Sequence, residues 1–558
     1  MTEEQTVEGG LAEPEELEPE QGSLDLAGPQ DRHDRAEWEA AAAAVLRKAR
    51  RLGDDDADAL VWERLTRTTL DGIGITPLGR PADLDDLTTT GRPIRVGAWD
   101  VRAHLAVADV KTDNATLLAD LEGGVSSLWL EAPGDTEWEA LLDGILLDLA
   151  PVVLQTTEDG ARAFLRHVAG RELDPRTNLG VDASAATKDL AGLARQAGVR
   201  AFVVNAAAAH DRGASDVQEL AQSLAVGAAY LRTLTEAGVG LDEATHLVEF
   251  RYAATDEQFA TIAKLRAARR LWARVLELSG AEARDQRQHA VTSRPMMSKY
   301  DPWVNLLRTT VAAFAAGVGG ADAVTVLPFD TPLGTPDSFG RRIARNTSHL
   351  LIDESHVAVV TDPGGGAYAV EKLTDDLAVA AWELFGRLDD GADLDELIAE
   401  TVERRDREVA TRERPITGLS EFPNLAEQLP ERPPAAVGSE ARRYGAAFEA
   451  LRDDPAREPV LLAPLGAVAQ HTARATFATN LLAAGGVAVA TEGSCRVACV
   501  VGTDSAYDEE GADRAAALRA AGAEWVIVAG KPREWADDSV ALGVDALDFL
   551  RRTRERLA

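Results

Sequence analysis

Short β-rich runs alternate with long amphipathic stretches between about residues 90 and 330. Eight such alternations in one block predict a closed (β/α)8 barrel, and a doubly wound open sheet is the competing architecture. The eight runs are Ile94–Asp100, Ser126–Glu131, Val152–Thr156, Asn178–Asp182, Ala201–Asn205, Leu247–Tyr252, Ala290–Ser293 and Val324–Phe329.

The stretches between these runs have the periodicity of helices. In one of them the apolar residues recur at helical spacing, which predicts a single buried face. That face carries Phe259, Ile262, Leu265, Trp272 and Leu276.

The N-terminal region divides into an acidic arm and a helix. Residues 1–34 contain eleven acids and one arginine, so we expect a disordered arm, with ordering on a partner as the alternative. Residues 36–52 have the pattern of an amphipathic helix that ends before Gly53. Its predicted apolar face carries Trp38, Ala41, Ala42, Val45 and Leu46.

The chain beyond the barrel divides into helices, a proline-rich linker and a second α/β block. Residues 371–411 and 441–453 are predicted to be helical, and Pro415–Pro434 is predicted to be irregular. From residue 457 onward, β-rich runs again alternate with helical stretches, which predicts a flavodoxin-like domain. The predicted parts are an arm over 1–34, a helical segment over 35–75, a barrel over 76–385, a linker over 386–456 and the flavodoxin-like domain over 457–558.

Composition narrows the possible functions. The 558 residues carry a net charge of −35, which argues against nucleic-acid binding. No run of about 18 apolar residues occurs, so we expect no membrane span. The chain has only two cysteines, Cys495 and Cys499, which fits a reducing cytoplasm better than a disulfide framework. Without a nearby histidine they are too few for zinc, so we interpret both as small buried hydrophobes.

Several long runs resemble the methylmalonyl-CoA mutase family. They are Ile262–Leu271, Asp301–Asp322, Leu327–Asp330, Arg341–Thr347 and Asp362–Tyr368. The resemblance implies a substrate-binding (β/α)8 barrel, a helical linker and a cobalamin domain. It also implies the interconversion of methylmalonyl-CoA and succinyl-CoA, for which adenosylcobalamin supplies a radical.

The loop that binds cobalt in this family has changed in the present sequence. The segment after Val460–Leu462 resembles a cobalamin-binding strand–loop–helix, whose loop carries Asp-x-His-x-x-Gly. Those three positions hold Val468, Gln470 and Ala473 here. A shift of one residue would place His471 at the ligand position, but the flanking Asp and Gly would still be missing. We therefore predict no cobalamin ligand, with His471 as the only weak candidate.

Two barrel residues that the family uses are also missing. The family histidine that hydrogen-bonds the thioester aligns with Ala208, and His210 falls where relatives have Gln. The family tyrosine near the first strand should precede Pro93–Asp100, yet the first tyrosine of the chain is Tyr230. His210 and Asp211 could form an acid–base pair, but adjacent residues usually point apart, which favours surface polar residues.

The chain keeps the family's sequence pattern but lacks its functional residues. In this combination it resembles the small subunit of a bacterial heterodimeric mutase. The resemblance then implies that a large subunit carries cobalamin and catalysis, while this chain binds no cofactor and no metal. An active mutase with a divergent site and a CoA-ester-binding regulatory protein remain the alternatives.

Two further motifs have more than one interpretation. Arg341, Arg342 and Arg345 share a predicted helix and could contact a CoA phosphate or pair with Asp330 or Asp337. Gly364–Gly366 lacks the Lys-Ser/Thr of a phosphate loop, so we interpret it as a turn.

Overall fold

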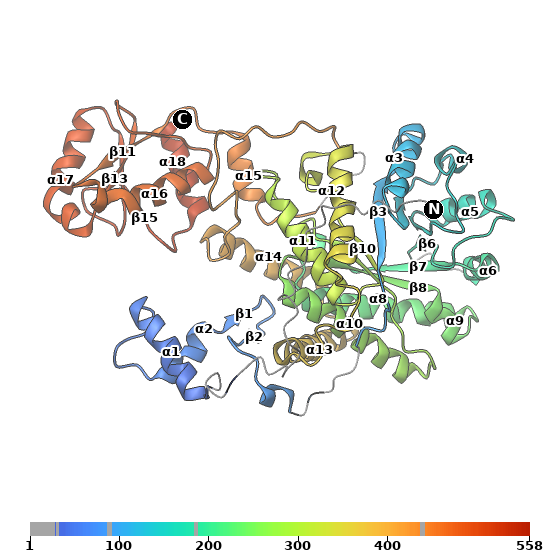
Figure 1. Ribbon diagram of the computed structural model, residues 1–558. Coiled ribbons are helices and arrows are strands. Elements are labelled where there is room, and N and C mark those ends of the chain that lie inside the picture. Colours follow the sequence, from blue (N-terminus) through green and yellow to red (C-terminus); the bar gives the residue numbers. More distant parts are fainter. Residues whose placement is uncertain (1–27, 29–32, 86, 88–91, 183–187, 436–440) are drawn as a thin grey trace, which may run out of the picture. The chain divides into compact units, whose positions relative to one another are not determined.

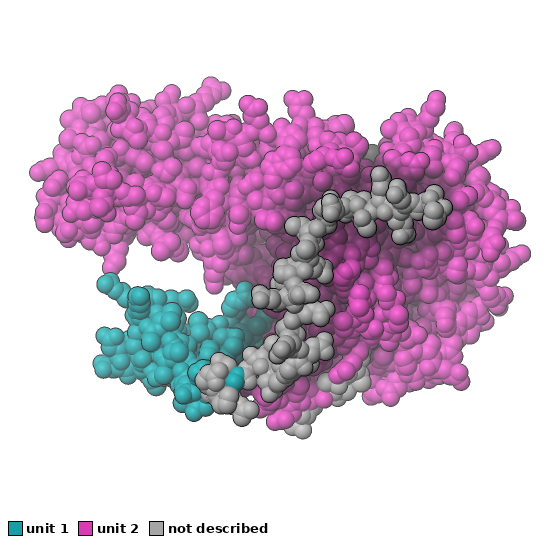
Figure 2. Space-filling view, viewed as in Figure 1, with its two compact units in different colours: residues 1–67, 74–78 teal, residues 68–73, 79–558 magenta. Residues whose placement is uncertain are grey.

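The computed structural model describes residues 28, 33–85, 87, 92–182, 188–435 and 441–558 (Figure 1). The predicted acidic arm therefore lies almost entirely outside the described residues. The chain forms two compact units, residues 1–67 with 74–78 and residues 68–73 with 79–558 (Figure 2).

The smaller unit has a core of its own. Helix α1 (Arg35–Lys48) begins at Asp34, whose side chain accepts a hydrogen bond from the Glu37 amide. The ring centroids of Trp38 and Trp62 lie 4.7 Å apart. The helix is shorter than predicted, and its buried residues are Ala43 and Leu46, whereas Val45 is 67% exposed. The predicted face was therefore partly wrong. The smaller unit also contains α2 (Val61–Leu65) and β2 (Gly74–Ile75), and β2 forms a two-stranded sheet with β1 (Arg67–Thr68) at the unit boundary.

The larger unit contains a closed barrel of eight parallel strands, as predicted, in the order β10-β3-β4-β5-β6-β7-β8-β9. The strands are β3 (Asp100–Ala106), β4 (Ser127–Glu131), β5 (Val152–Gln155), β6 (Asn178–Val181), β7 (Arg200–Asn205), β8 (Val248–Ala254), β9 (Gln288–Thr292) and β10 (Ala323–Thr325). The first predicted strand, Ile94–Asp100, was wrong. That segment is irregular, and Ile94 and Val96 are 66% and 86% exposed.

Helices follow the barrel strands along the chain (Figure 1). They are α3 (Val110–Glu122), α4 (Trp138–Leu141), α5 (Glu158–His167), α6 (Lys188–Ala197), α7 (Ala207–Arg212), α8 (Asp216–Glu236), α9 (Leu241–His246), α10 (Gln258–Ser279), α11 (Val304–Val318) and α12 (Ser338–His349). Helix α10 is buried on several faces, because Lys264, Arg266 and Arg269 are covered as well as Ile262. Phe259, predicted to be buried, is 61% exposed.

Three helices connect the barrel to the C-terminal domain. They are α13 (Tyr368–Asp389), α14 (Leu394–Ala410) and α15 (Ala446–Asp453), so the predicted helical stretch 371–411 is two helices. Gly364–Gly366 forms a turn, in which the Gly366 amide donates to Glu371 Oε1 at 2.9 Å. None of the described helices combines the length and apolarity that a membrane crossing requires.

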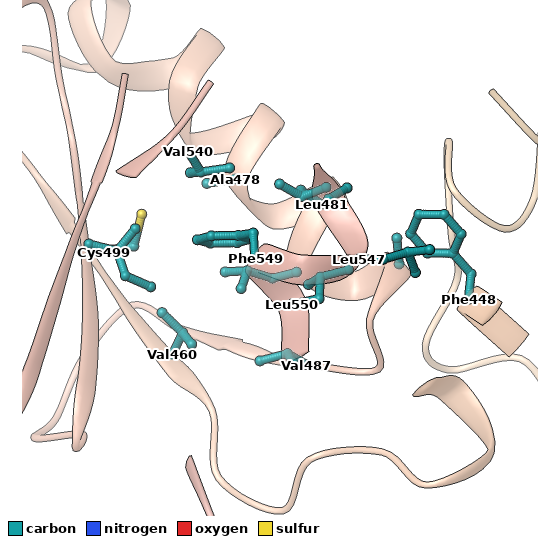
Figure 3. Close-up of a cluster of buried hydrophobic side chains, with 14 of the residues drawn as sticks. Phe448, Val460, Ala478, Leu481, Val487, Cys499, Val540, Leu547, Phe549 and Leu550 are labelled. Atoms are coloured by element: carbon teal, nitrogen blue, oxygen red, sulfur yellow. The ribbon is translucent and has the colours of Figure 1, made fainter. Parts of the chain in front are cut away.

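The C-terminal domain is a five-stranded parallel sheet in the order β12-β11-β13-β14-β15, which is the flavodoxin-like order. Its elements are β11 (Val460–Pro464), α16 (Val468–Ala484), β12 (Val489–Ala490), β13 (Val497–Val501), α17 (Asp504–Ala520), β14 (Trp525–Ala529), β15 (Asp538–Val540) and α18 (Ala546–Leu557). Figure 3 shows its core, where Phe549 and Leu550 of α18 lie near Cys499 and Val460, and Phe448 of α15 joins the same cluster.

Candidate functional site

Side chains that meet across the barrel axis occupy its interior. Trp129 of β4 and Arg251 of β8 come from strands on opposite sides of the barrel, yet the guanidinium carbon lies 3.9 Å from the Trp129 ring centroid. Trp129 is 2% exposed. Arg251 also donates to Gln155 Oε1 at 2.9 Å and to His289 Nδ1 at 3.1 Å. A chain of side-chain contacts therefore crosses the barrel interior from one side to the other.

Burial is energetically demanding for this central arginine. Desolvation and the neighbouring Arg102 together lower the pKa of Arg251 to about 9, although Glu249 opposes the shift. The cation is held by the aromatic face of Trp129 and by neutral acceptors. His289 completes the layer by sharing a hydrogen bond of 2.8 Å with Thr325 Oγ1.

A second layer of charged residues lies nearer the amino ends of the strands. Arg102 of β3 donates to Glu249 Oε1 of β8 at 2.7 Å, and both side chains are essentially fully buried. Burial raises the pKa of Glu249, but Arg102 and Arg287 outweigh it and the pKa falls. Because β3 and β8 are not neighbours, this ion pair also spans the barrel interior.

The carboxyl end of the barrel carries a buried polar network around His210. His210 Nε2 lies 2.7 Å from Ser293 Oγ, whereas its Nδ1 is 3.9 Å from Glu219 Oε2, too far for a hydrogen bond. Lys264 Nζ donates to Glu219 Oε2 at 2.6 Å and contacts Asp216 Oδ1 at 2.8 Å. The sequence analysis did not predict this network. Its one indication in the sequence was Lys264, a charged residue between the apolar Ile262 and Leu265 of a predicted helix.

His210 is therefore not the surface residue that the sequence suggested, since it is 3% exposed. Its neighbour Asp211 pairs with Arg294, with 3.3 Å between Asp211 Oδ2 and Arg294 Nη1. Ala208, which the sequence resemblance aligns with the family histidine, is exposed on α7, and its methyl group offers no hydrogen bond.

The linker contacts the loops at this end of the barrel. The Arg442 amide donates to the Asp211 carbonyl at 2.8 Å, and the Tyr444 amide donates to the Pro295 carbonyl at 2.9 Å. The ring of Tyr444 lies under the Arg405 guanidinium of α14, 4.9 Å from its carbon. These contacts fix linker backbone beside His210 and Ser293.

Two of the three arginines of α12 pair with one buried aspartate. Arg341 Nε donates to Asp120 Oδ2 at 3.0 Å, and Arg345 Nη1 donates to Asp120 Oδ1 at 3.0 Å. Arg342 lies over Phe339. Asp330 and Asp337, the acids considered from the sequence, instead pair with Arg432 of the linker at 2.6 and 2.8 Å.

The residues that the sequence resemblance aligns with the family's cobalt-binding loop lie in a helix. Helix α16 begins at Val468, which is 73% exposed, and Ala473 is also exposed. The Gln470 Oε1 atom accepts a hydrogen bond from the Ala467 amide at 2.7 Å, so this side chain caps the helix. His471 lies in the first turn, and its Nδ1 has no hydrogen-bond partner.

These residues do not fit a cobalamin. Val468 and Ala473 carry no hydrogen-bonding group, and the side-chain oxygen of Gln470 is engaged by the Ala467 amide. Among the described residues, no three His, Cys, Asp or Glu side chains form a group that could hold a metal. Cys495 is half-buried and Cys499 is buried, so only the second matches its predicted burial.

A histidine at position 470 alone is not expected to create a cobalamin site. The variant Gln470→His loses the cap on Ala467 and still lacks the flanking Asp and Gly. We expect the visible spectrum of added cobalamin to stay unchanged on mixing with Gln470→His, as with the unmodified chain. A shift of the corrin bands with the variant, absent from an Ala473→Gly control, would contradict this prediction.

Comparisons with known proteins agree with the fold. A family model described as methylmalonyl-CoA mutase matches residues 193–501. A methylmalonyl-CoA mutase small subunit from Streptomyces virginiae is 44% identical, with 93% of this chain and 96% of the relative covered. The small subunit from Propionibacterium freudenreichii subsp. shermanii is 34% identical, with 96% of each covered. The mitochondrial methylmalonyl-CoA mutase of Bos taurus is 35% identical over only 34% of this chain and 26% of its own length.

Proposed function

Because the chain belongs to the methylmalonyl-CoA mutase family, we propose that it is the non-catalytic small subunit of a heterodimeric mutase. The observation that carries this proposal is the occupied barrel axis, where Trp129 and Arg251 stand in contact from opposite strands. A ligand that extended along the barrel axis would have to displace these two side chains. The family sequence is nevertheless retained over both domains, which makes sense if the outer surface serves an assembly.

The partner in this proposal is the large subunit. It would hold the acyl-CoA substrate and adenosylcobalamin, while the present chain binds no cofactor. The assembled enzyme would act in the cytoplasm, in propionate metabolism. The changed positions Ala208, Val468, Gln470 and Ala473 support this division of labour, since none of them can perform the family's chemistry.

Co-expression with the large subunit tests the proposal. Size-exclusion chromatography with light scattering and corrin absorbance should reveal a 1:1 heterodimer with one cobalamin. The same chain expressed alone should carry no corrin and show no mutase turnover. A cobalamin-dependent rate from this chain alone would overturn the proposal, and so would a large subunit that never associates with it.

A further inference from the structure

The C-terminal sheet has an unusually short crossover between two of its strands. Parallel strands are normally joined by a dozen or more residues that include a helix. Here β12 ends at Ala490 and β13 begins at Val497, so residues 491–496 make the whole connection. No helix forms in this connection, so the sheet face beside α17 lacks the cover that a crossover helix would give.

The other short crossover of the domain is filled by a side chain. Between β14 and β15, Trp535 lies against Tyr507, with ring centroids 6.0 Å apart. The connection over 491–496 has no residue of that size, since its sequence is Thr-Glu-Gly-Ser-Cys-Arg. A cavity of about 180 Å³ remains there.

This cavity has an apolar wall and a cationic rim. The wall is formed by Leu461, Ala517, Leu518, Ala521 and Ala523, and the rim by Gly493, Ser494, Cys495 and Arg514. A volume of about 180 Å³ is room for a small organic molecule.

Arg514 has no hydrogen bond or ion pair to any residue that the structure describes, and its Nε is buried. The nearby arginines are paired, because Arg496 lies 3.0 Å from Glu524 and Arg519 lies 2.8 Å from Asp537. A buried N–H without an acceptor is unfavourable. A guanidinium that faces a cavity is well suited to bind a carboxylate through two hydrogen bonds.

We propose that this cavity is a binding site for a short-chain carboxylate. The carboxylate would pair with the guanidinium of Arg514, and the alkyl chain would lie on the wall formed by Leu461 and Leu518. The site lies at the amino ends of β11 and β13, on the opposite edge of the sheet from the family's cobalt-binding positions.

The two cysteines allow the proposal to be tested on the full chain. Cys495 lines the cavity, whereas Cys499 is 1% exposed and should not react while the domain is folded. Iodoacetate and iodoacetamide have nearly the same size, but only the first is an anion. Peptide mass spectrometry gives the alkylation rate of Cys495 with each reagent. The ratio of the two rates measures the attraction of the cavity for a carboxylate.

We expect the rate ratio to exceed that of free cysteine by about two- to fivefold, the range for one partly exposed charge pair. Millimolar butyrate should slow the reaction of Cys495 with iodoacetamide. Both effects should be lost in Arg514→Gln and kept in Arg519→Gln on the same helix. A ratio equal to that of free cysteine, or butyrate protection that persists in Arg514→Gln, would overturn the proposal.

Discussion

Lys264→Met is expected to lower the free energy of unfolding of the larger unit by about 3–5 kcal/mol, the usual loss when one partner of a buried ion pair is removed. Lys264 and Glu219 are both fully covered, and the lysine also contacts Asp216. Methionine matches the length of lysine but cannot neutralise Glu219, whose other oxygen is committed to the Ala253 amide. Urea unfolding followed by tryptophan fluorescence measures the loss.

The pH dependence of this loss identifies its cause. Burial raises the pKa of Glu219 to about 7 even beside the lysine, and without the lysine we expect the pKa to rise further. A carboxyl whose folded pKa is raised stabilises the fold as pH falls, so the penalty should be smaller at pH 6 than at pH 8. Arg274→Met is the matched control, because Arg274 is on the same helix and its pair with Glu277 is more than half exposed. It should cost less than about 1 kcal/mol. Equal losses in the two variants would contradict the prediction.

The same buried charges explain which part of the barrel the sequence could predict. Runs such as Val152–Thr156 and Ala201–Asn205 are apolar because they face helices and neighbouring strands, and they are strands as predicted. The first strand was missed because Asp100, Arg102 and His104 make it look like a loop. Arg102 is buried there only because Glu249, almost 150 residues later, neutralises it across the axis. No local pattern contains that partner.

In the candidate site, too, some features could be inferred from the sequence and others depend on the fold. The hypothesis that Ala208 and Gln470 cannot perform the family's chemistry rests on the sequence alone, since each position needs a particular side chain. That Trp129 and Arg251 fill the barrel could not be inferred, because it depends on β4 and β8 being opposite each other. The sequence leaves only six residues between β12 and β13, which is too short for the usual crossover helix. Strand β15, only Asp538–Val540, was too short and too polar to be recognised from the sequence.

His210 should make the fold sensitive to acid. Desolvation, together with the charges of Lys264 and Arg405, lowers its pKa to about 3, although Asp216 opposes them. In the unfolded chain His210 binds a proton near pH 6.5, whereas in the folded chain it stays neutral until the pH is near 3. The stability that is present above pH 6.5 is therefore lost as the pH falls toward 3. At 1.36 kcal/mol per unit, the full loss would be on the order of 4–5 kcal/mol.

Comparison with His210→Gln isolates this contribution from the other groups of the network. Glu219 titrates in the opposite sense, with a folded pKa of about 7, but it is present in both chains. The difference in unfolding free energy between the unmodified chain and His210→Gln should be constant above pH 7. Below pH 6.5 it should shift steadily in favour of the variant. Ser293→Ala, which removes the hydrogen-bond partner but no titrating group, should give an offset that varies much less with pH. A pH-independent difference for His210→Gln would mean that the imidazole accepts a proton in the folded chain, and that the network around Ser293 can open to water.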